Sequence, residues 1–208
     1  MRLLTILGWA AVGAALTPLS DRASLVLPAR GGHAAATASQ HRLRRPLIAL
    51  WLACAFGWLA WRHGLSPETF VVSVYAAIFV IIALIDLDHH LILNLVVAPA
   101  AVFALLAAFA LPQMSLARAL VGGATGFVLM LLPAAILPGG LGAGDVKLAG
   151  FLGLAAGFPA ILTALASGII LGGVATLALL ITRRIGRRDY VPYGPFLLLG
   201  AVLVLMQW

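Results

Sequence analysis

Two of the six acidic residues stand where apolar runs are interrupted. Asp145 lies in a glycine-rich break, Leu137 to Leu148, and Asp86 closes an earlier apolar run. An ionisable group next to the apolar interior of a bilayer is costly and usually serves a function. Two carboxylates that meet can act as general base and general acid, which is chemistry that hydrolyses a peptide bond without a metal or a covalent nucleophile. Because two like charges a few ångströms apart cannot both ionise, we expect the pair to titrate as one unit with one raised pKa.

The glycines before Asp145 have a mechanical use. Gly139, Gly140, Gly142 and Gly144 let the backbone leave a helix and approach an extended substrate without side chains in the way. A Gly-x-Gly-Asp sequence alone is also typical of an ordinary turn between helices. Lys147, just beyond, could hold this loop, pair with a carboxylate, or only mark the cytoplasmic side of the membrane.

Several neighbouring side chains admit two readings. Asp88 could replace Asp86 in the pair, although it lies further into the loop, where a carboxylate is usually solvated. His89 and His90 could tune the proton affinity of Asp86 or serve as interfacial anchors. With Cys54 as the single cysteine and no helical His-x-x-x-His pair, the sequence predicts neither a metal site nor a cofactor.

The composition predicts the elements that must position these groups. The 208 residues are 63% hydrophobic and 9% charged, with mean hydropathy +1.13, so the chain cannot hide its apolar surface as a soluble domain. Strongly apolar spans without the alternation of barrel strands must be helices. We therefore expect an all-α polytopic membrane protein of about eight spans. They are Leu3–Leu19, Pro46–Trp61, Phe70–Ile85, Leu91–Leu111, Ala117–Leu137 (interrupted late by Pro133), Val146–Leu154, Ala160–Ile181 and Pro195–Met206.

The positive charges test this topology. The formal charge of +7 would suggest nucleic acid in a soluble protein, but here the cations lie between spans, so we expect a lipid bilayer and no nucleic acid as the environment. With the N-terminus outside, ten of the 13 Lys and Arg residues fall in cytoplasmic loops. The chain crosses out once and back once between Asp86 and Asp145. Both aspartates are therefore expected at cytoplasmic ends of helices.

The two acidic motifs together resemble the type IV prepilin leader peptidases, intramembrane aspartic proteases of the Gly-x-Gly-Asp type. Asp86 and Asn94 match the first motif, and Gly142 to Leu148 matches the second; Val191 to Phe196 is a softer third match. The resemblance implies that Asp86 and Asp145 are catalytic. It assigns substrate-binding or loop-shaping roles to Gly142, Gly144, Lys147 and Asn94, and makes Asp88 a bystander. Leu93 departs from the pattern, because the family usually has proline there.

The resemblance also implies a substrate and a location. Family members cleave a short basic leader from prepilins or type II secretion pseudopilins, which suits an enzyme of the bacterial inner membrane with its site at the cytoplasmic face. Bifunctional members carry paired cysteines after the first span. The expected loop from Ser20 to Arg45 has none, so we expect a shortened form without N-methyltransferase activity.

The expected organisation is a first span with its basic loop, residues 1–45, followed by a membrane-embedded peptidase domain, residues 46–208. Two other classes of function stay open: a catalytically inactive assembly factor for pili or secretion, and a small ion-coupled transporter. Against the transporter, both aspartates fall at the ends of spans rather than at their centres. The sequence does not specify the oligomeric state.

Overall fold

The fold consists of helices throughout the part of the chain that the structure describes, which is residues 2–30, 44–136, 142–186 and 191–207 of a computed structural model. These residues contain no strand, which confirms the all-α prediction. The helices are α1 (Arg2–Ala15), α2 (Thr17–Arg30), α3 (Arg44–His63), α4 (Pro67–His89), α5 (Asn94–Ala107), α6 (Leu116–Ile136), α7 (Ala143–Ala156), α8 (Ala160–Ile181) and α9 (Gly194–Leu205).

Each of the eight expected apolar segments contains a helix. Four stretches are long and apolar enough to cross a bilayer: Arg2–Ala29, which joins α1 to α2, and the helices α4, α6 and α8. The helices α5 and α9 are shorter but apolar. At 14 residues, α7 is too short to cross a bilayer alone. Helix α6 continues through Pro133, where the sequence suggested an interruption. The protein is a multi-pass membrane protein.

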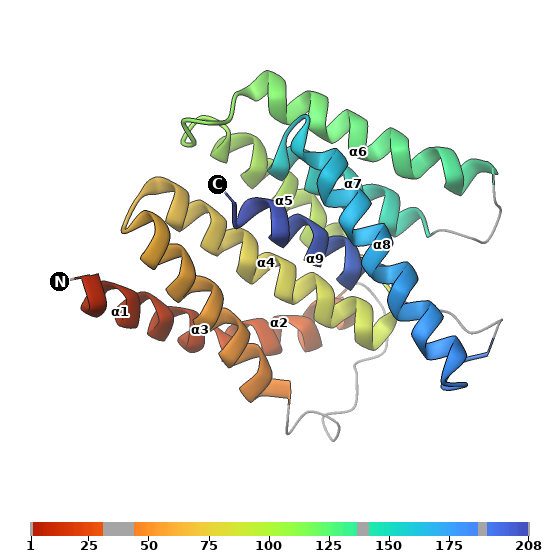
Figure 1. The fold of residues 1–208 in the computed structure, drawn as a ribbon, viewed down its shortest axis with the longest axis horizontal. Coiled ribbons are helices and arrows are strands. Elements are labelled where there is room, and N and C mark those ends of the chain that lie inside the picture. The colour runs from red at the N-terminus through yellow and green to blue at the C-terminus, as the bar shows by residue number, and fades with distance from the viewer. Residues whose placement is uncertain (1, 31–43, 137–141, 187–190, 208) are drawn as a thin grey trace.

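Helix α4 is the interior helix of the bundle. In its most apolar 18-residue stretch 61% of the residues are buried, against 28% for α6 and 22% for α8. It packs against α2 and α3 on one side and against α9 on the other, while α6 pairs with α7 (Figure 1). Because every neighbour restrains α4, a side chain near its end has a fixed position.

Aromatic and glycine contacts fix α7 relative to its neighbours. Phe151 of α7 packs against Tyr75 and Phe79 of α4, with ring centroids 6.3 and 5.9 Å apart. On its other side, Gly153 of α7 lies in backbone contact with Gly122 of α6, so close that a Cβ on either would collide with the other's carbonyl oxygen. Small residues permit such approaches between membrane helices. These contacts fix the second half of α7 between α4 and α6, and the same helix carries Asp145 in its first turn.

Residues 20–30, expected as part of a flexible loop, instead form most of α2. The prediction was wrong because the polar side chains of this segment are buried among partners rather than solvated. Asp21 is 1% exposed and forms an ion pair with Arg45, with 2.7 Å between Oδ2 and Nε. The Ser24 hydroxyl donates to the Asp21 carbonyl oxygen at 2.8 Å. Residues 31–43, the rest of the expected loop, lie outside the described residues.

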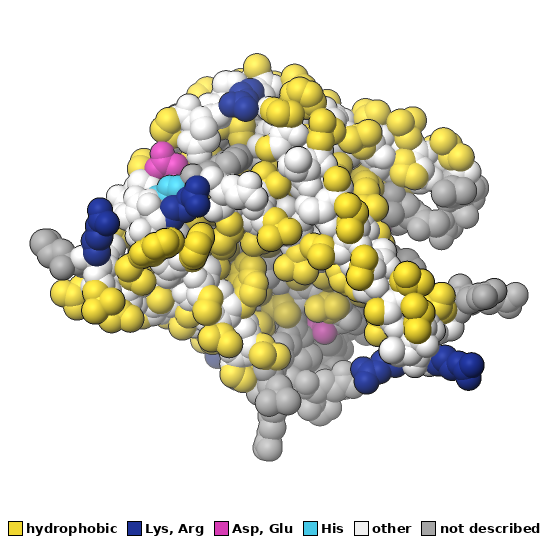
Figure 2. Space-filling view, in the orientation of Figure 1, with side chains coloured by type: hydrophobic (Ala, Val, Ile, Leu, Met, Phe, Trp, Pro, Cys, Tyr) yellow, Lys and Arg dark blue, Asp and Glu magenta, His cyan; other side chains and the backbone are white. Residues whose placement is uncertain are grey.

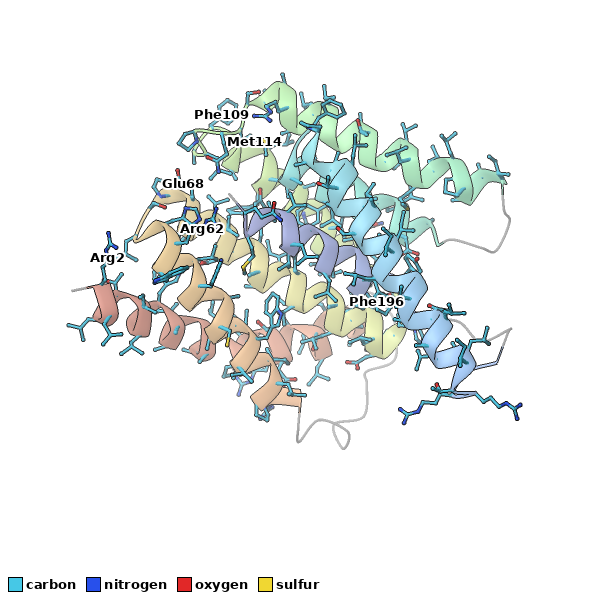
Figure 3. The ribbon with its side chains drawn as sticks, in the orientation of Figure 1. Arg2, Arg62, Glu68, Phe109, Met114 and Phe196 are labelled. Atoms are coloured by element: carbon cyan, nitrogen blue, oxygen red, sulfur yellow. The ribbon has the colours of Figure 1, made fainter. Side chains whose placement is uncertain are left out.

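The charged side chains gather at two opposite ends of the molecule, with an apolar belt between them (Figure 2). Arg2 and Arg62 lie at one end, whereas Phe196, in the first turn of α9, lies near the other (Figure 3). Arg183 and Arg184 follow the end of α8, on the side where α9 begins. This distribution agrees with the expected topology, in which Arg2 and Arg62 are outside and Arg183 and Arg184 are cytoplasmic.

Candidate active site

Asp86 lies in the last turn of α4. The helix ends at His89 and is capped by His90, which has a left-handed conformation (φ 52°) and whose backbone N–H donates to the Asp86 carbonyl oxygen at 2.8 Å. The side chain is 2% exposed. Its Oδ2 accepts a hydrogen bond from the backbone N–H of Gly194, at 3.0 Å. Gly194 is the first residue of α9, where helix N–H groups lack partners within the helix, so the end of one helix stabilises a carboxylate on another.

Asp145 lies in the first turn of α7, three residues after Gly142, the residue that caps the helix. The side chain is 4% exposed. Burial, and to a smaller extent repulsion from the Asp86 charge, raise the pKa of this carboxyl to about 6. A hydrogen bond from the Gly142 backbone favours the ionised form and opposes this rise. A buried acid near neutrality is suited to hold a proton and release it.

The two carboxylates interact with each other and with the turn that precedes α9. Asp86 raises the pKa of Asp145 through its charge, so the two groups interact electrostatically. Gly194 is bound to Asp86. Its neighbour Tyr193 has a pKa raised by burial and then by the charge of Asp145. Asp86 is thus hydrogen-bonded to the Tyr193–Gly194 turn, and the charge of Asp145 acts on Tyr193 of the same turn. That the two carboxylates form a catalytic pair stays a prediction.

The predicted loop-shaping residues surround the pair. Lys147 Nζ donates to Asn94 Oδ1 at 3.1 Å, which joins the start of α7 to the start of α5. A Cβ on Gly144 would lie 3.0 Å from the Cβ of Ile92, so the segment after Asp86 approaches this position closely. Gly142 has an extended backbone (φ −74°, ψ 142°). Gly139 and Gly140 lie outside the described residues.

Leu93 occupies the position where the family usually has proline, and its backbone has a conformation that proline could also adopt. It precedes α5 with φ −78° and ψ 128°. This φ lies within the range that a proline ring would impose. The side chain of Leu93 also packs against the hydrophobic core. The turn after Asp86 is therefore built without proline.

The remaining sequence candidates follow Asp86 directly, and His90 is close enough to it for the two groups to interact electrostatically. Asp88 and His89 are half-buried in the last turn of α4. Within the described ranges, no group of three or more His, Cys, Asp or Glu side chains is close enough to hold a metal ion. The absence of a metal or cofactor stays a prediction, as do the roles of Asp88, His89 and His90.

Gly194 and Tyr193 are the site residues to which the sequence alone gave no role. A Cβ on Gly194 would lie 2.5 Å from Asp86 Oδ2. The Tyr193 hydroxyl donates to the Ile169 carbonyl oxygen of α8 at 3.0 Å, so the turn is tied to a third helix. The only signal in the sequence was the Tyr-Gly-Pro turn before the last apolar run. The group that binds Asp86 is a backbone N–H, which nearly every residue type has, so the residue type does not reveal it.

Comparison with known proteins identifies the family. The model of the type IV leader peptidase family matches residues 73–177, about half of the chain, including both aspartates. The chain belongs to this family. A prepilin leader peptidase/N-methyltransferase of Bacillus subtilis is 30% identical over 158 residues, covering 76% of this chain and 64% of the relative. No solved structure shows a significant match.

Two proteins of the same name from Pseudomonas are also similar. That of P. aeruginosa is 28% identical over 86% of this chain and 63% of its own length, and that of P. putida 26% identical over 84% and 62%. The chain therefore spans less than two thirds of the length of these leader peptidase relatives. The family match begins after α3 and ends before Tyr193 and Gly194.

Proposed function

We propose that this protein is an aspartic endopeptidase of the bacterial inner membrane that removes the basic leader from type IV prepilins or type II secretion pseudopilins. The observation that supports this most strongly is the pair of buried carboxylates at one end of the bundle, with Asp86 fixed by the Gly194 amide. The cytoplasmic face is favoured because Arg45, Arg183 and Arg184 lie at helix ends that the positive-inside rule assigns to the cytoplasm. The names of the relatives supply the substrate class.

In this mechanism a water molecule lies between the two carboxylates. The Gly194 N–H stabilises the negative charge on Asp86, so Asp86 takes a proton from the water as general base. Asp145 holds the shared proton and donates it to the carbonyl oxygen of the scissile bond. The tetrahedral intermediate then breaks its C–N bond, and the proton taken up by Asp86 passes to the leaving amine. Water supplies one oxygen of the new carboxyl group. Asp145 takes a proton back from a hydroxyl of the intermediate as the carbonyl re-forms, so the pair returns to one shared proton.

The test of this proposal is cleavage of a type IV prepilin by the purified protein in detergent, with the leader released and detected by mass. If the prepilin stays intact after prolonged incubation with folded protein, the result would contradict the proposed peptidase activity and favour a catalytically inactive assembly factor. Lack of N-methylation stays a separate prediction, and the same assay with S-adenosylmethionine added would detect a methylated N-terminus.

The rate should depend on pH through the shared proton. Because the pKa of Asp145 is raised to about 6, its protonated form is present below that pH and is lost as the pH rises through it. We expect kcat/KM to fall on the alkaline side with a slope of one proton, when initial rates are measured across the acidic-to-neutral range. Asp88→Asn serves as a control, and this variant should show the same alkaline decrease in kcat/KM as the wild type. A rate that is constant through the same range would contradict a shared proton.

The Lys147–Asn94 hydrogen bond should contribute modestly through positioning. Lys147→Ala removes a solvent-exposed bond worth about 1 kcal/mol or less, so we expect kcat/KM to fall by about fivefold or less. Because both residues act through one bond, the Asn94→Ala variant and the double variant should lose about the same factor as Lys147→Ala. Losses that multiply in the double variant would show that the two residues act separately.

A further inference from the structure

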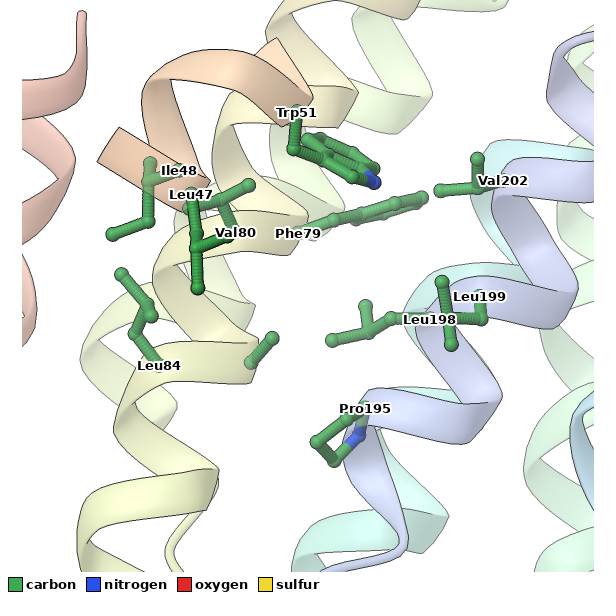
Figure 4. A pocket seen from close by; sticks show the side chains of 11 residues that line it. Leu47, Ile48, Trp51, Phe79, Val80, Leu84, Pro195, Leu198, Leu199 and Val202 are labelled. Atoms are coloured by element: carbon green, nitrogen blue, oxygen red, sulfur yellow. The ribbon is translucent and has the colours of Figure 1, made fainter. Parts of the chain in front are cut away.

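An apolar groove runs between α3, α4 and α9 toward the candidate active site. It has a volume of about 270 Å³, and all of its lining residues are hydrophobic, among them Trp51 of α3, Phe79 and Ala83 of α4, and Pro195 and Leu199 of α9 (Figure 4). The walls stand opposite one another, with α3 and α4 on one side and α9 on the other.

The groove approaches Asp86 along both α4 and α9. On α4, the lining residues are Phe79, Val80, Ala83 and Leu84, and Leu84 lies two residues before Asp86. On α9, the lining begins at Pro195, directly after Gly194, whose N–H is bound to Asp86. The lining therefore ends two residues before Asp86 on α4 and begins one residue after Gly194 on α9, beside the carboxylate that the proposed mechanism uses as general base.

We propose that this groove binds the apolar helix of the substrate, the segment that follows the scissile bond. This inference rests on the proposed function, because it takes the substrate to be a basic leader joined to an apolar helix. Along α9 the lining extends from Pro195 to Val202, which is about 10 Å or two helical turns at 1.5 Å per residue. A helix seated there would gain packing contacts with three helices, and packing is what drives association of apolar helices in lipid.

The geometry also explains how the scissile bond reaches the pair. A substrate helix alongside α4 and α9 would end at the level of Gly194, where the apolar lining ends and Asp86 lies nearby. The chain before that point leaves the helix and extends across the two carboxylates, with its basic leader on the cytoplasmic side. The groove would thus select an apolar helix at a fixed distance from the bond that is cut.

The test compares two tryptophan substitutions of leucines with similar exposure. Leu199→Trp narrows the groove, whereas Leu129→Trp adds the same bulk on α6, away from it; the two leucines are 43% and 41% exposed. The long substrate is a synthetic prepilin segment with a basic leader and an apolar helix of about 20 residues. The short substrate ends shortly after the scissile bond.

For the long substrate we expect Leu199→Trp to raise KM about tenfold with little change in kcat, and Leu129→Trp to behave as wild type. Cleavage of the short substrate should be unchanged in both variants. Equal KM values for the two variants, or an equal loss on both substrates, would overturn the proposal. If wild-type protein cleaves neither substrate, the proposed function itself fails, and this result is distinct from the other two.

A second measurement covers the case in which Leu199→Trp disturbs the fold. A benzophenone amino acid at position 199, in an Asp145→Asn background, should form a photo-crosslink to the apolar segment of the long substrate, and one at position 129 should not. Crosslinks from position 199 to lipid alone, in the presence of saturating substrate, would show that acyl chains occupy the groove and would contradict the proposal.

Discussion

Asp86→Asn and Asp145→Asn should each reduce kcat/KM for prepilin cleavage by about 10³-fold or more. Each substitution removes one of the two groups that must exchange a proton with the substrate, and general acid–base catalysis contributes about 10² to 10⁴ for one group. Asparagine keeps an oxygen that can accept the Gly194 N–H, so Asp86→Asn should fold normally. Initial rates with a prepilin in detergent measure the effect.

The matched control for this pair is Asp88→Asn, two residues further along the same helix. It removes a carboxylate from the last turn of α4 but should leave the cleavage rate within about twofold of wild type, as is usual for changes away from the reacting groups. Undiminished cleavage by either Asp86→Asn or Asp145→Asn would contradict the assignment of the pair.

Gly194→Ala should cost about 10² in kcat although it removes no ionisable group. The new Cβ would lie 2.5 Å from Asp86 Oδ2, so the carboxylate must move and its hydrogen bond to the Gly194 N–H must lengthen or break. A displacement of about 1 Å at a catalytic group can have an effect of this size. Single-turnover cleavage rates at saturating substrate measure kcat without the binding step.

Gly173→Ala is the control for Gly194→Ala. It makes the same substitution on α8, where a Cβ would meet nothing within 4 Å. Alanine has the higher helix propensity, so this variant should keep full activity and at least the wild-type stability. If Gly194→Ala were as active as Gly173→Ala, the Gly194 amide would have no part in positioning Asp86.

The parts of the fold that the sequence predicts well are those with strong apolar runs. The spans of α4, α6 and α8 follow from about 20 consecutive apolar residues each, because no other structure satisfies their backbone in lipid. The ends that carry Asp86 and Asp145 follow from the same runs, since each acid stands where a run stops.

Helix α2 was missed for a physical reason. Polar and charged side chains alternate with apolar ones along it, and it includes Pro28, so the pattern resembles a solvated connector. Burial of Asp21 beside Arg45 satisfies that polarity within the protein, and such a partner 24 residues away cannot be recognised from composition. The role of Gly194 was missed in the same way, because the hydrogen bond to Asp86 comes from the backbone and joins residues 108 positions apart.

The most direct test of the account is whether positions 86 and 145 are close together at one face of the membrane. In a Cys54→Ser background, cysteines replacing Asp86 and Asp145 would be treated in sealed vesicles with a short bifunctional thiol reagent, and the crosslinked peptides identified by mass. We predict an intramolecular crosslink between the two positions. Two singly modified cysteines, one labelled only by impermeant reagent outside the vesicles and the other only by reagent trapped inside, would contradict a shared catalytic pair.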